Sequence, residues 1–154
     1  MILSMDTNTA TDALHLDNQL CFALHSASLA MTKVYKPHLD ALGVTYPQYL
    51  VLLVLWERDG VTVSAIGERL FLDSGTLTPL LKRLEAQGLL SRTRDAQDER
   101  RVVIRLTEQG RALKQAAAAI PGCILGATGC AVEQVLDLAR QVAQLRDRLA
   151  EAKR

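Results

Sequence analysis

The sequence predicts a mainly helical domain with one small β-hairpin, and three observations support this fold class. Of the 154 residues, 49% are hydrophobic but only 4% are aromatic, so strong helix formers outnumber the residues that strands favour. Apolar residues recur at helical spacing over long stretches. One short stretch instead alternates as paired strands do. The length fits a single globular domain with its own core.

Two helices are predicted first. Residues 17–42 form a long helix that ends before Gly43 and has Pro37 as a potential kink. Its apolar positions are Leu20, Leu24, Ala27, Met31, Val34 and Leu39. The segment Thr45-Tyr46-Pro47-Gln48 has the form of a capping box with proline in the first turn. It opens a helix that is apolar nearly all round until Gly60, so we expect that helix to be central.

Two short helices joined by a tight turn come next. In chain order the segments are an extended piece at 61–63, a helix at 64–70, a polar turn at 72–75, and a helix through Leu77, Leu80, Leu81 and Leu84 to Gly88. This arrangement is a helix-turn-helix. Pro79 leaves the start of its second helix open. Either Thr78-Pro79 is a cap and first-turn pair, or the helix begins near Asp73 and contains the proline.

A hairpin and further helices complete the chain. The predicted segments are strands at 89–94 and 101–106 around a charged tip at 95–99, a helix from the Thr107 cap to about Ala119, a break at Pro121-Gly122, and a last helix that starts at about 123 or 131 and ends at 152. The last helix is amphipathic, with apolar residues at Val132, Val135, Leu138, Val142, Leu145 and Leu149.

Basic residues are concentrated where the helix-turn-helix meets the hairpin. The chain has a net charge of +1, yet residues 82–105 hold seven Lys and Arg against four acidic residues. Helix, helix and basic hairpin, in that order, are the plan of a winged helix-turn-helix, whose second helix enters the major groove of DNA. The alternative is that these side chains only cap helices and solvate the surface. Their order along the chain favours DNA binding.

The candidate DNA contacts lie on the second helix and on the wing. On the helix, we expect phosphate or base-edge contacts from Ser74, Thr76, Thr78, Lys82 and Arg83. On the wing, Arg100 or Arg101 is expected to enter the minor groove, with Asp98 orienting a neighbouring guanidinium.

Three cysteines, Cys21, Cys123 and Cys130, form neither a disulfide framework nor a metal-ligand cluster. Cys21 lies between Leu20 and Phe22 in the first long helix, where a buried, inert thiol is the default expectation. A sensing thiol needs partial access, a stabilised thiolate and a partner for the oxidised sulfur.

Candidate partners for Cys21 lie far from it along the sequence. Tyr35 follows it by 14 positions, which is about 21 Å along a straight helix. A phenol contact would therefore come from another subunit, and Tyr46 could join it. Cys123 and Cys130 are seven positions apart and would share a face if their stretch were helical. Either could resolve an oxidised Cys21, or both are ordinary small apolar residues.

Several stretches resemble the MarR winged-helix regulators. They are Asp73–Glu85, Gly88–Leu90, Asp95–Arg101 and Leu106–Gly110. Three others are similar to the OhrR branch of that family, which are repressors that sense organic hydroperoxides: Leu20–Leu24, Leu42–Tyr49 and Ile120–Gly122. The resemblance begins at about residue 17 and covers nearly all of the remaining chain.

The resemblance implies a homodimer that binds double-stranded operator DNA and takes organic hydroperoxides as inducer. It assigns Cys21 as the peroxide-reactive cysteine, with its thiolate hydrogen-bonded by Tyr35 and Tyr46 of the opposite subunit. It also makes Arg100 the wing-tip arginine. Cysteines after the Ile-Pro-Gly break suggest the two-cysteine type, in which Cys123 or Cys130 forms an intersubunit disulfide.

The resemblance also divides the chain. Residues 1–154 are one MarR-type domain, in which helices 17–42 and 107–152 serve dimerisation and 45–106 form the DNA-binding lobe.

Two other functions are possible alternatives for this sequence. One is a MarR-type repressor released by a small aromatic ligand, with Cys21 only a core residue. The other is a thiol peroxidase, although nothing in the chain resembles a peroxidase fold. We expect no enzyme activity and no cofactor. A metal site is not expected either, because His15, His25 and His38 are scattered along the chain. No apolar run is long enough for a membrane span and the start, with Met5 as an alternative first residue, lacks a secretory signal, so a cytoplasmic location is expected.

Overall fold

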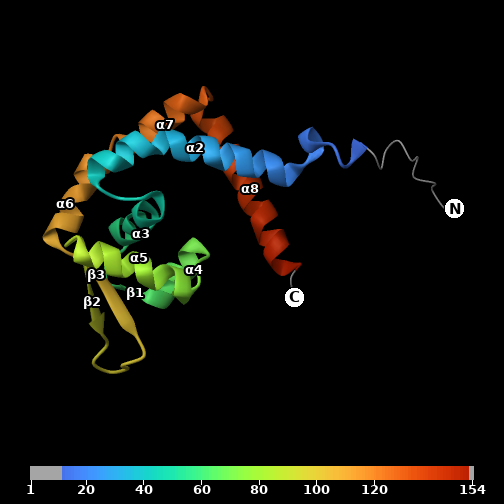
Figure 1. Cartoon of the computed structure of the whole chain (residues 1–154). Helices are drawn as coiled ribbons and strands as arrows, with labels where there is room; N and C mark the ends of the chain where they lie inside the picture. Colours follow the sequence, from blue (N-terminus) through green and yellow to red (C-terminus); the bar gives the residue numbers. More distant parts are fainter. Residues whose placement is uncertain (1–11, 153–154) are drawn as a thin grey trace.

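The computed structural model describes residues 12–152, so the alternative start at Met5 lies outside the described residues. A long helix spans the molecule, a compact lobe lies beneath one end of it, and a second helical arm lies near its other end (Figure 1). The elements in chain order are η1 (Leu16–Asn18), α2 (Leu20–Leu42), α3 (Tyr46–Glu57), β1 (Val61–Thr62), α4 (Val63–Leu70), α5 (Ser74–Ala86), β2 (Leu90–Arg94), β3 (Val102–Leu106), α6 (Glu108–Ala117), α7 (Ile120–Thr128) and α8 (Val132–Glu151).

The corner between α2 and α3 is fixed by local hydrogen bonds. Gly43 ends α2 in the left-handed conformation, with φ of 72°, which glycine adopts without steric cost. The backbone N–H of Thr45 donates to Oε1 of Gln48 at 2.9 Å, and the Gln48 N–H donates to Oγ1 of Thr45 at 3.4 Å. This confirms the predicted capping box. The buried side chains of α3 include Val51, Leu52 and Leu55, so its central position is confirmed as well.

The helix-turn-helix consists of α4 and α5. Oγ1 of Thr62 accepts from the Ala65 N–H at 3.1 Å and caps α4, so the predicted extended piece stops at Thr62 instead of Val63. Asp73 caps α5 by accepting from the Thr76 N–H at 2.7 Å. The second helix therefore begins at Ser74 and contains Pro79. Of the two alternatives that the sequence left open, the structure selects the longer helix.

The hairpin forms the wing. Strands β2 and β3 pair antiparallel with Leu90 opposite Leu106 and Arg92 opposite Ile104, and β1 joins the other edge of β3. Ile104, on the central strand β3, is fully buried. The wing is tied back to α5 because Arg92 pairs with Glu85 at 3.2 Å. Both strands were predicted to within one residue.

Three helices follow the wing. Thr107 caps α6 as predicted, accepting from the Gly110 N–H at 3.1 Å. Pro121 lies in the first turn of α7, so the break at Pro121-Gly122 starts a new helix. Gly129, with φ of 66°, ends α7, and α8 begins at Val132, the later of the two predicted starts. Cys123 and Cys130 were expected to share a face only if their stretch were helical, and that condition is not met, because Gly129 ends α7 before Cys130.

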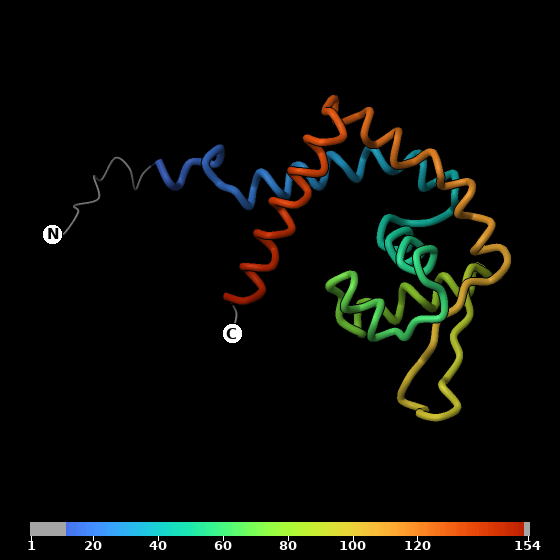
Figure 2. Tube along the Cα trace, turned by 180° about the vertical axis from the view of Figure 1, so that it is seen from behind, coloured from blue at the N-terminus to red at the C-terminus, as the bar shows by residue number. Residues whose placement is uncertain are grey.

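The core and the arms differ in burial. The buried hydrophobic residues come from the end of α2, from α3 to α6 and the sheet, and from the start of α7. No described residue of α8 is buried. The tube in Figure 2 shows α8 turned back past α2, and the two helices line an apolar groove of about 310 Å³. Within residues 12–152, no single helix is long and apolar enough to cross a membrane, while two bent helix pairs pass that test on length and composition alone.

Candidate functional site

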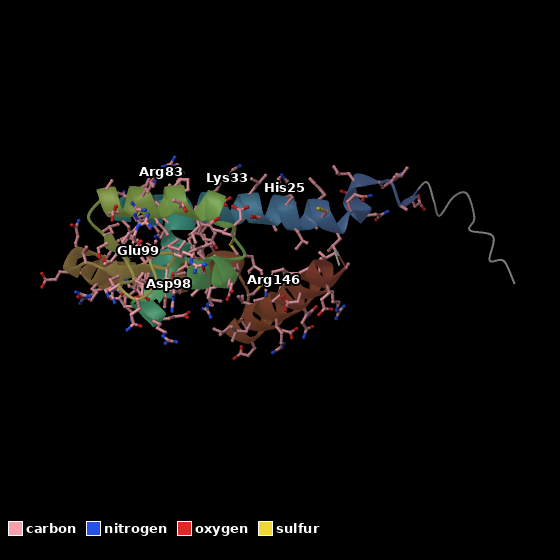
Figure 3. All side chains as sticks on the ribbon, turned by 90° about the horizontal axis from the view of Figure 1, so that it is seen from below. His25, Lys33, Arg83, Asp98, Glu99 and Arg146 are labelled. Atoms are coloured by element: carbon pink, nitrogen blue, oxygen red, sulfur yellow. The ribbon has the colours of Figure 1, made fainter. Side chains whose placement is uncertain are left out.

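The candidate recognition helix α5 presents a polar outer face. Ser74, Thr76, Lys82 and Arg83 are exposed, and Thr78 is half-buried, while Figure 3 shows Arg83 projecting from the outer side of the helix. The buried side is held by Leu77, Leu81 and Leu84. The hydroxyl groups therefore lie in the first turns of the helix and the cations lie farther along it. This is the arrangement expected of a helix that contacts DNA phosphates with its N-terminus.

Asp73 anchors the start of that helix. Hydrogen bonds from the backbone and side chain of Thr76, and from the backbone of Gly75, lower the pKa of this carboxyl below its usual value. The carboxylate is therefore charged at neutral pH, where its stabilisation of the helix end is fully present. That stabilisation is lost only as the pH falls through the lowered pKa.

The tip of the wing is organised by Asp98. Its Oδ1 accepts from the Arg100 N–H at 3.1 Å and lies 3.5 Å from Nε of the same arginine. The Arg100 side chain is 95% exposed, and Arg101 is exposed beside it. The structure thus brings Asp98 and Arg100 together as predicted. An arginine that is held at its base and free at its end is suited to insertion into a narrow minor groove.

Cys21 is exposed in the first turn of α2. The expectation of a buried core thiol, drawn from its apolar neighbours, is wrong within the single chain. Those neighbours are themselves uncovered, since Leu20 is 59% and Phe22 is 40% exposed. A chain whose apolar residues face solvent gives no shelter to the thiol, so access to this sulfur is open.

Tyr35 and Tyr46 form a tilted aromatic pair on the corner between α2 and α3, with an interplanar angle of 55°. Their ring centroids are 5.0 Å apart, and Tyr49 joins them at 6.0 Å from Tyr35. Desolvation by burial raises the pKa of all three phenols, and for Tyr35 the neighbouring phenols add to that rise. The hydroxyl groups therefore stay protonated at neutral pH and can donate hydrogen bonds to an anion.

Cys21 and this tyrosine cluster are far apart along one helix. Because α2 is continuous from Leu20 to Leu42, the 14 positions between Cys21 and Tyr35 span about 21 Å. The helix does not fold back, so the cluster cannot contact the cysteine of its own chain.

The other two cysteines are accessible in different settings. Cys123 is exposed in the first turns of α7, and Cys130 is exposed in the turn between α7 and α8. The Cys130 thiol donates to the carbonyl of Thr128 at 3.4 Å, and its N–H donates to Oγ1 of that threonine at 3.2 Å. No group of three or more metal-binding side chains gathers anywhere in residues 12–152.

Sequence reasoning missed residues that join the site to its surroundings. Tyr49 completes the aromatic cluster and meets Trp56 edge to face, with the ring centroids 6.3 Å apart. Trp56 Nε1 donates to the Gly110 carbonyl at 3.0 Å. The guanidinium of Arg146, a residue of α8 that Figure 3 labels, lies over the Phe71 ring at 4.0 Å from its centroid. The signal for Tyr49 was available, since all three tyrosines of the chain lie within residues 35–49.

Comparison with known proteins assigns the chain to a family. A family model described as transcriptional regulator SarA/Rot matches residues 33–117, more than half of the chain. The organic hydroperoxide resistance transcriptional regulator of Bacillus subtilis (strain 168) is 60% identical over 115 residues, which cover 75% of this chain and 78% of that protein. The chain belongs to the MarR-type winged-helix regulators, in the OhrR branch.

Other relatives of this OhrR-type regulator agree. The HTH-type transcriptional regulator TtmR of Methylorubrum extorquens (strain PA1) is 51% identical over 138 residues, covering 90% of this chain and 71% of that protein. A solved structure of reduced AbfR bound to DNA matches with a TM-score of 0.77 and 35% identity over 92% of this chain and 99% of that one; AbfR comes from Staphylococcus epidermidis. Disulfide-formed AbfR matches with a TM-score of 0.63 and 36% identity over 91% and 98%. The chain is therefore a DNA-binding transcriptional regulator and not an enzyme.

Proposed function

We propose that this regulator is a homodimeric repressor that binds operator DNA while Cys21 is reduced and releases it when an organic hydroperoxide oxidises Cys21. The observation that carries the proposal is the exposed position of Cys21 on α2, about 21 Å from the Tyr35–Tyr46 pair of the same chain. In a two-fold dimer every contact occurs twice, so each chain can offer its tyrosines to the other chain's cysteine. One copy therefore lacks a complete sensing site, and two copies have two.

The dimer interface is formed by the helical arms. Large apolar side chains are exposed along α2 and α8, at 54% for Leu29, 40% for Met31, 62% for Leu136 and 61% for Leu138. Exposed large apolar side chains of this kind are typical of a protein–protein interface. A second copy that covers these arms would also hold two α5 helices at a fixed separation, as required to bind half-sites about one turn of DNA apart.

In the reduced dimer the phenols of Tyr35 and Tyr46 donate hydrogen bonds to the Cys21 thiolate of the other subunit. Such donors favour the charged form of the sulfur, and the thiolate is the nucleophile in peroxide chemistry. The sulfur attacks the terminal oxygen of the hydroperoxide, the O–O bond breaks, and the alcohol leaves after taking up a proton. Cys21 is then a sulfenic acid.

A second thiol completes the switch. Cys123 or Cys130 of the other subunit attacks the sulfenic sulfur, a disulfide forms, and water leaves with the sulfenic oxygen. A disulfide requires its two Cα atoms within about 7 Å, so segments that begin farther apart must move. Solved AbfR structures in reduced, DNA-bound and in disulfide forms support a change of this kind, and we expect it to alter the spacing of the two α5 helices.

The surroundings of Cys21 favour an organic inducer. Leu20 and Phe22 flank it, and Leu24 lines the apolar groove between α2 and α8. An alkyl or aryl hydroperoxide gains binding free energy from apolar contacts that hydrogen peroxide cannot make.

We expect the protein to act in the cytoplasm, where its operator DNA lies.

A gel shift on the DNA upstream of its own gene tests this function. Reduced protein should bind, one equivalent of cumene hydroperoxide should release the DNA, and dithiothreitol should restore binding. A non-reducing denaturing gel of the same samples should show a covalent dimer. Cys21→Ser should still bind DNA and ignore the peroxide, and whichever of Cys123→Ser and Cys130→Ser abolishes the covalent dimer identifies the resolving residue. Release of DNA from Cys21→Ser protein by the peroxide would refute the mechanism.

A further inference from the structure

A pair of glutamines joins the tyrosine corner to the end of the recognition helix. Gln87 is the C-cap that directly follows α5, and its Nε2 donates to the Gly43 carbonyl at 2.8 Å. Nε2 of Gln48 donates to Oε1 of Gln87 at 3.4 Å. Gln48 and Gln87 are 39 positions apart in sequence, so these bonds are tertiary contacts between two functional segments.

The corner held by these bonds is the one that carries Tyr46. Gly43 ends α2, Thr45 caps α3, and Tyr46 is the first residue of α3. Gln48 is only 5% exposed, and both ends of its amide are bonded, because its Oε1 accepts from the Thr45 N–H at 2.9 Å. The corner is thus fixed by amide hydrogen bonds to α5 at the point where α2 gives way to α3.

A groove lies beside the contact between Gln48 and Gln87, which we call the glutamine joint. An open groove of about 640 Å³ is lined by Asp40, Val44, Arg83 and Ala86 together with both glutamines. The end of α5 is therefore not packed tightly against the corner on this side. The hydrogen bonds of Gln87 supply a directional contact that the packing here does not.

We propose that Gln87 is a positioning residue that couples the redox state sensed at Tyr46 to the orientation of α5. The proposal rests on the function proposed above. Oxidation removes the thiolate that the Tyr35–Tyr46 pair hydrogen-bonds, so the corner loses its anchor on the other subunit. Gln87 then carries the displacement of the corner to α5, a helix of 13 residues. Such a helix is about 20 Å long and moves as a rigid lever.

Gln87→Met tests whether the glutamine joint couples the corner to α5, because methionine has a similar length and cannot form either hydrogen bond. Gln87 is exposed, so this variant should fold. Gln115→Met is the matched control, since Gln115 is an exposed glutamine on α6. The operator Kd is measured for each protein before and after one equivalent of cumene hydroperoxide, and sulfenic acid trapping gives the rate of Cys21 oxidation.

Wild-type and Gln115→Met proteins should show the same rise in Kd on oxidation. Gln87→Met should bind within about threefold of wild type when reduced and oxidise at the wild-type rate, yet its rise in Kd should be at least about tenfold smaller. An undiminished rise in Gln87→Met would overturn the inference, whether or not its reduced binding is weaker. If wild-type protein itself fails to release DNA on oxidation, the proposed function is refuted, and the coupling through the glutamine joint is refuted with it.

Discussion

The winged lobe and the helical arms both carry apolar residues at regular spacing, but only the lobe buries them within its own chain. In the lobe, Leu52, Ile66, Leu77 and Ile104 are completely buried. In α8, leucines at the same kind of helical spacing remain exposed, at 61% for Leu138. Helical periodicity alone therefore predicts a face that must be covered, but not whether its own chain or a second copy covers it.

The same division separates the two tasks of the molecule. The lobe closes around its own core, which gives α5 and the wing a fixed shape for contacting DNA. The arms leave both the apolar surface and Cys21 open. On this account the lobe is stable within one chain, whereas the sensing site exists only when two chains meet. Changes in the lobe should affect folding, and changes in the arms should affect assembly.

The largest effect is expected from a methyl group added at Gly110. A Cβ there would lie 2.0 Å from the Leu89 carbonyl oxygen, which is backbone and cannot move aside cheaply. Gly110→Ala should lower the free energy of unfolding by about 3 kcal/mol, measured by urea denaturation. Gly126→Ala is the control, because its added Cβ would meet nothing within 4 Å apart from its chain neighbours and the nearby backbone of its own helix, and it should gain about 0.5–1 kcal/mol from helix propensity. Equal stability of the two variants would contradict the tight packing at Gly110.

A charge placed on the apolar face of α8 should act on assembly. Leu138→Glu should raise the Kd of the dimer by at least about tenfold, which corresponds to about 1.4 kcal/mol, because a carboxylate would replace a leucine in the apolar interface. Sedimentation at several concentrations measures this. Gln144→Glu introduces the same charge at an exposed polar position of α8 and should leave the Kd unchanged. If Leu138→Glu protein stays dimeric, α8 is not part of the interface.

The smallest effect is expected from one cation on α5. Lys82→Ala should weaken DNA binding on all sequences and make the slope of log K against log salt shallower by about 0.9, because one phosphate contact is lost. Lys114→Ala, which removes an exposed lysine from α6, should keep the wild-type slope. An unchanged slope for Lys82→Ala would remove that residue from the phosphate contacts.

Local chemistry made much of this fold predictable from the sequence. Helix caps at Thr45, Thr107 and Gly43 could be predicted, because each residue acts on backbone groups only a few residues away. The alternation of residues 101–106 located a strand. The division between α7 and α8 could not be fixed, since it depends on the left-handed conformation of Gly129. The Gln48–Gln87 contact joins residues 39 positions apart, and no local pattern indicates it.

The candidate site was predicted unevenly for the same reason. Spacing along α2 was enough to place Tyr35 beyond reach of Cys21, because helix geometry fixes that distance. The exposure of Cys21 was missed, since apolar neighbours normally indicate burial. Here those neighbours are exposed in the single chain, and we expect a second chain to cover them. The pairing of Tyr35 with Tyr46 depends on how α3 returns beside α2, which is a tertiary feature.

A mixed dimer tests most directly whether the sensing site is shared between two chains. One subunit keeps Cys21 and carries Tyr35→Phe and Tyr46→Phe, while the other carries Cys21→Ser and keeps both tyrosines. The rate of Cys21 oxidation by cumene hydroperoxide is measured in this dimer and in a homodimer of the tyrosine variant. The account predicts a wild-type rate in the mixed dimer and a slow rate in the homodimer. An equally slow rate in both would show that the tyrosines act on the cysteine of their own chain, contrary to the account.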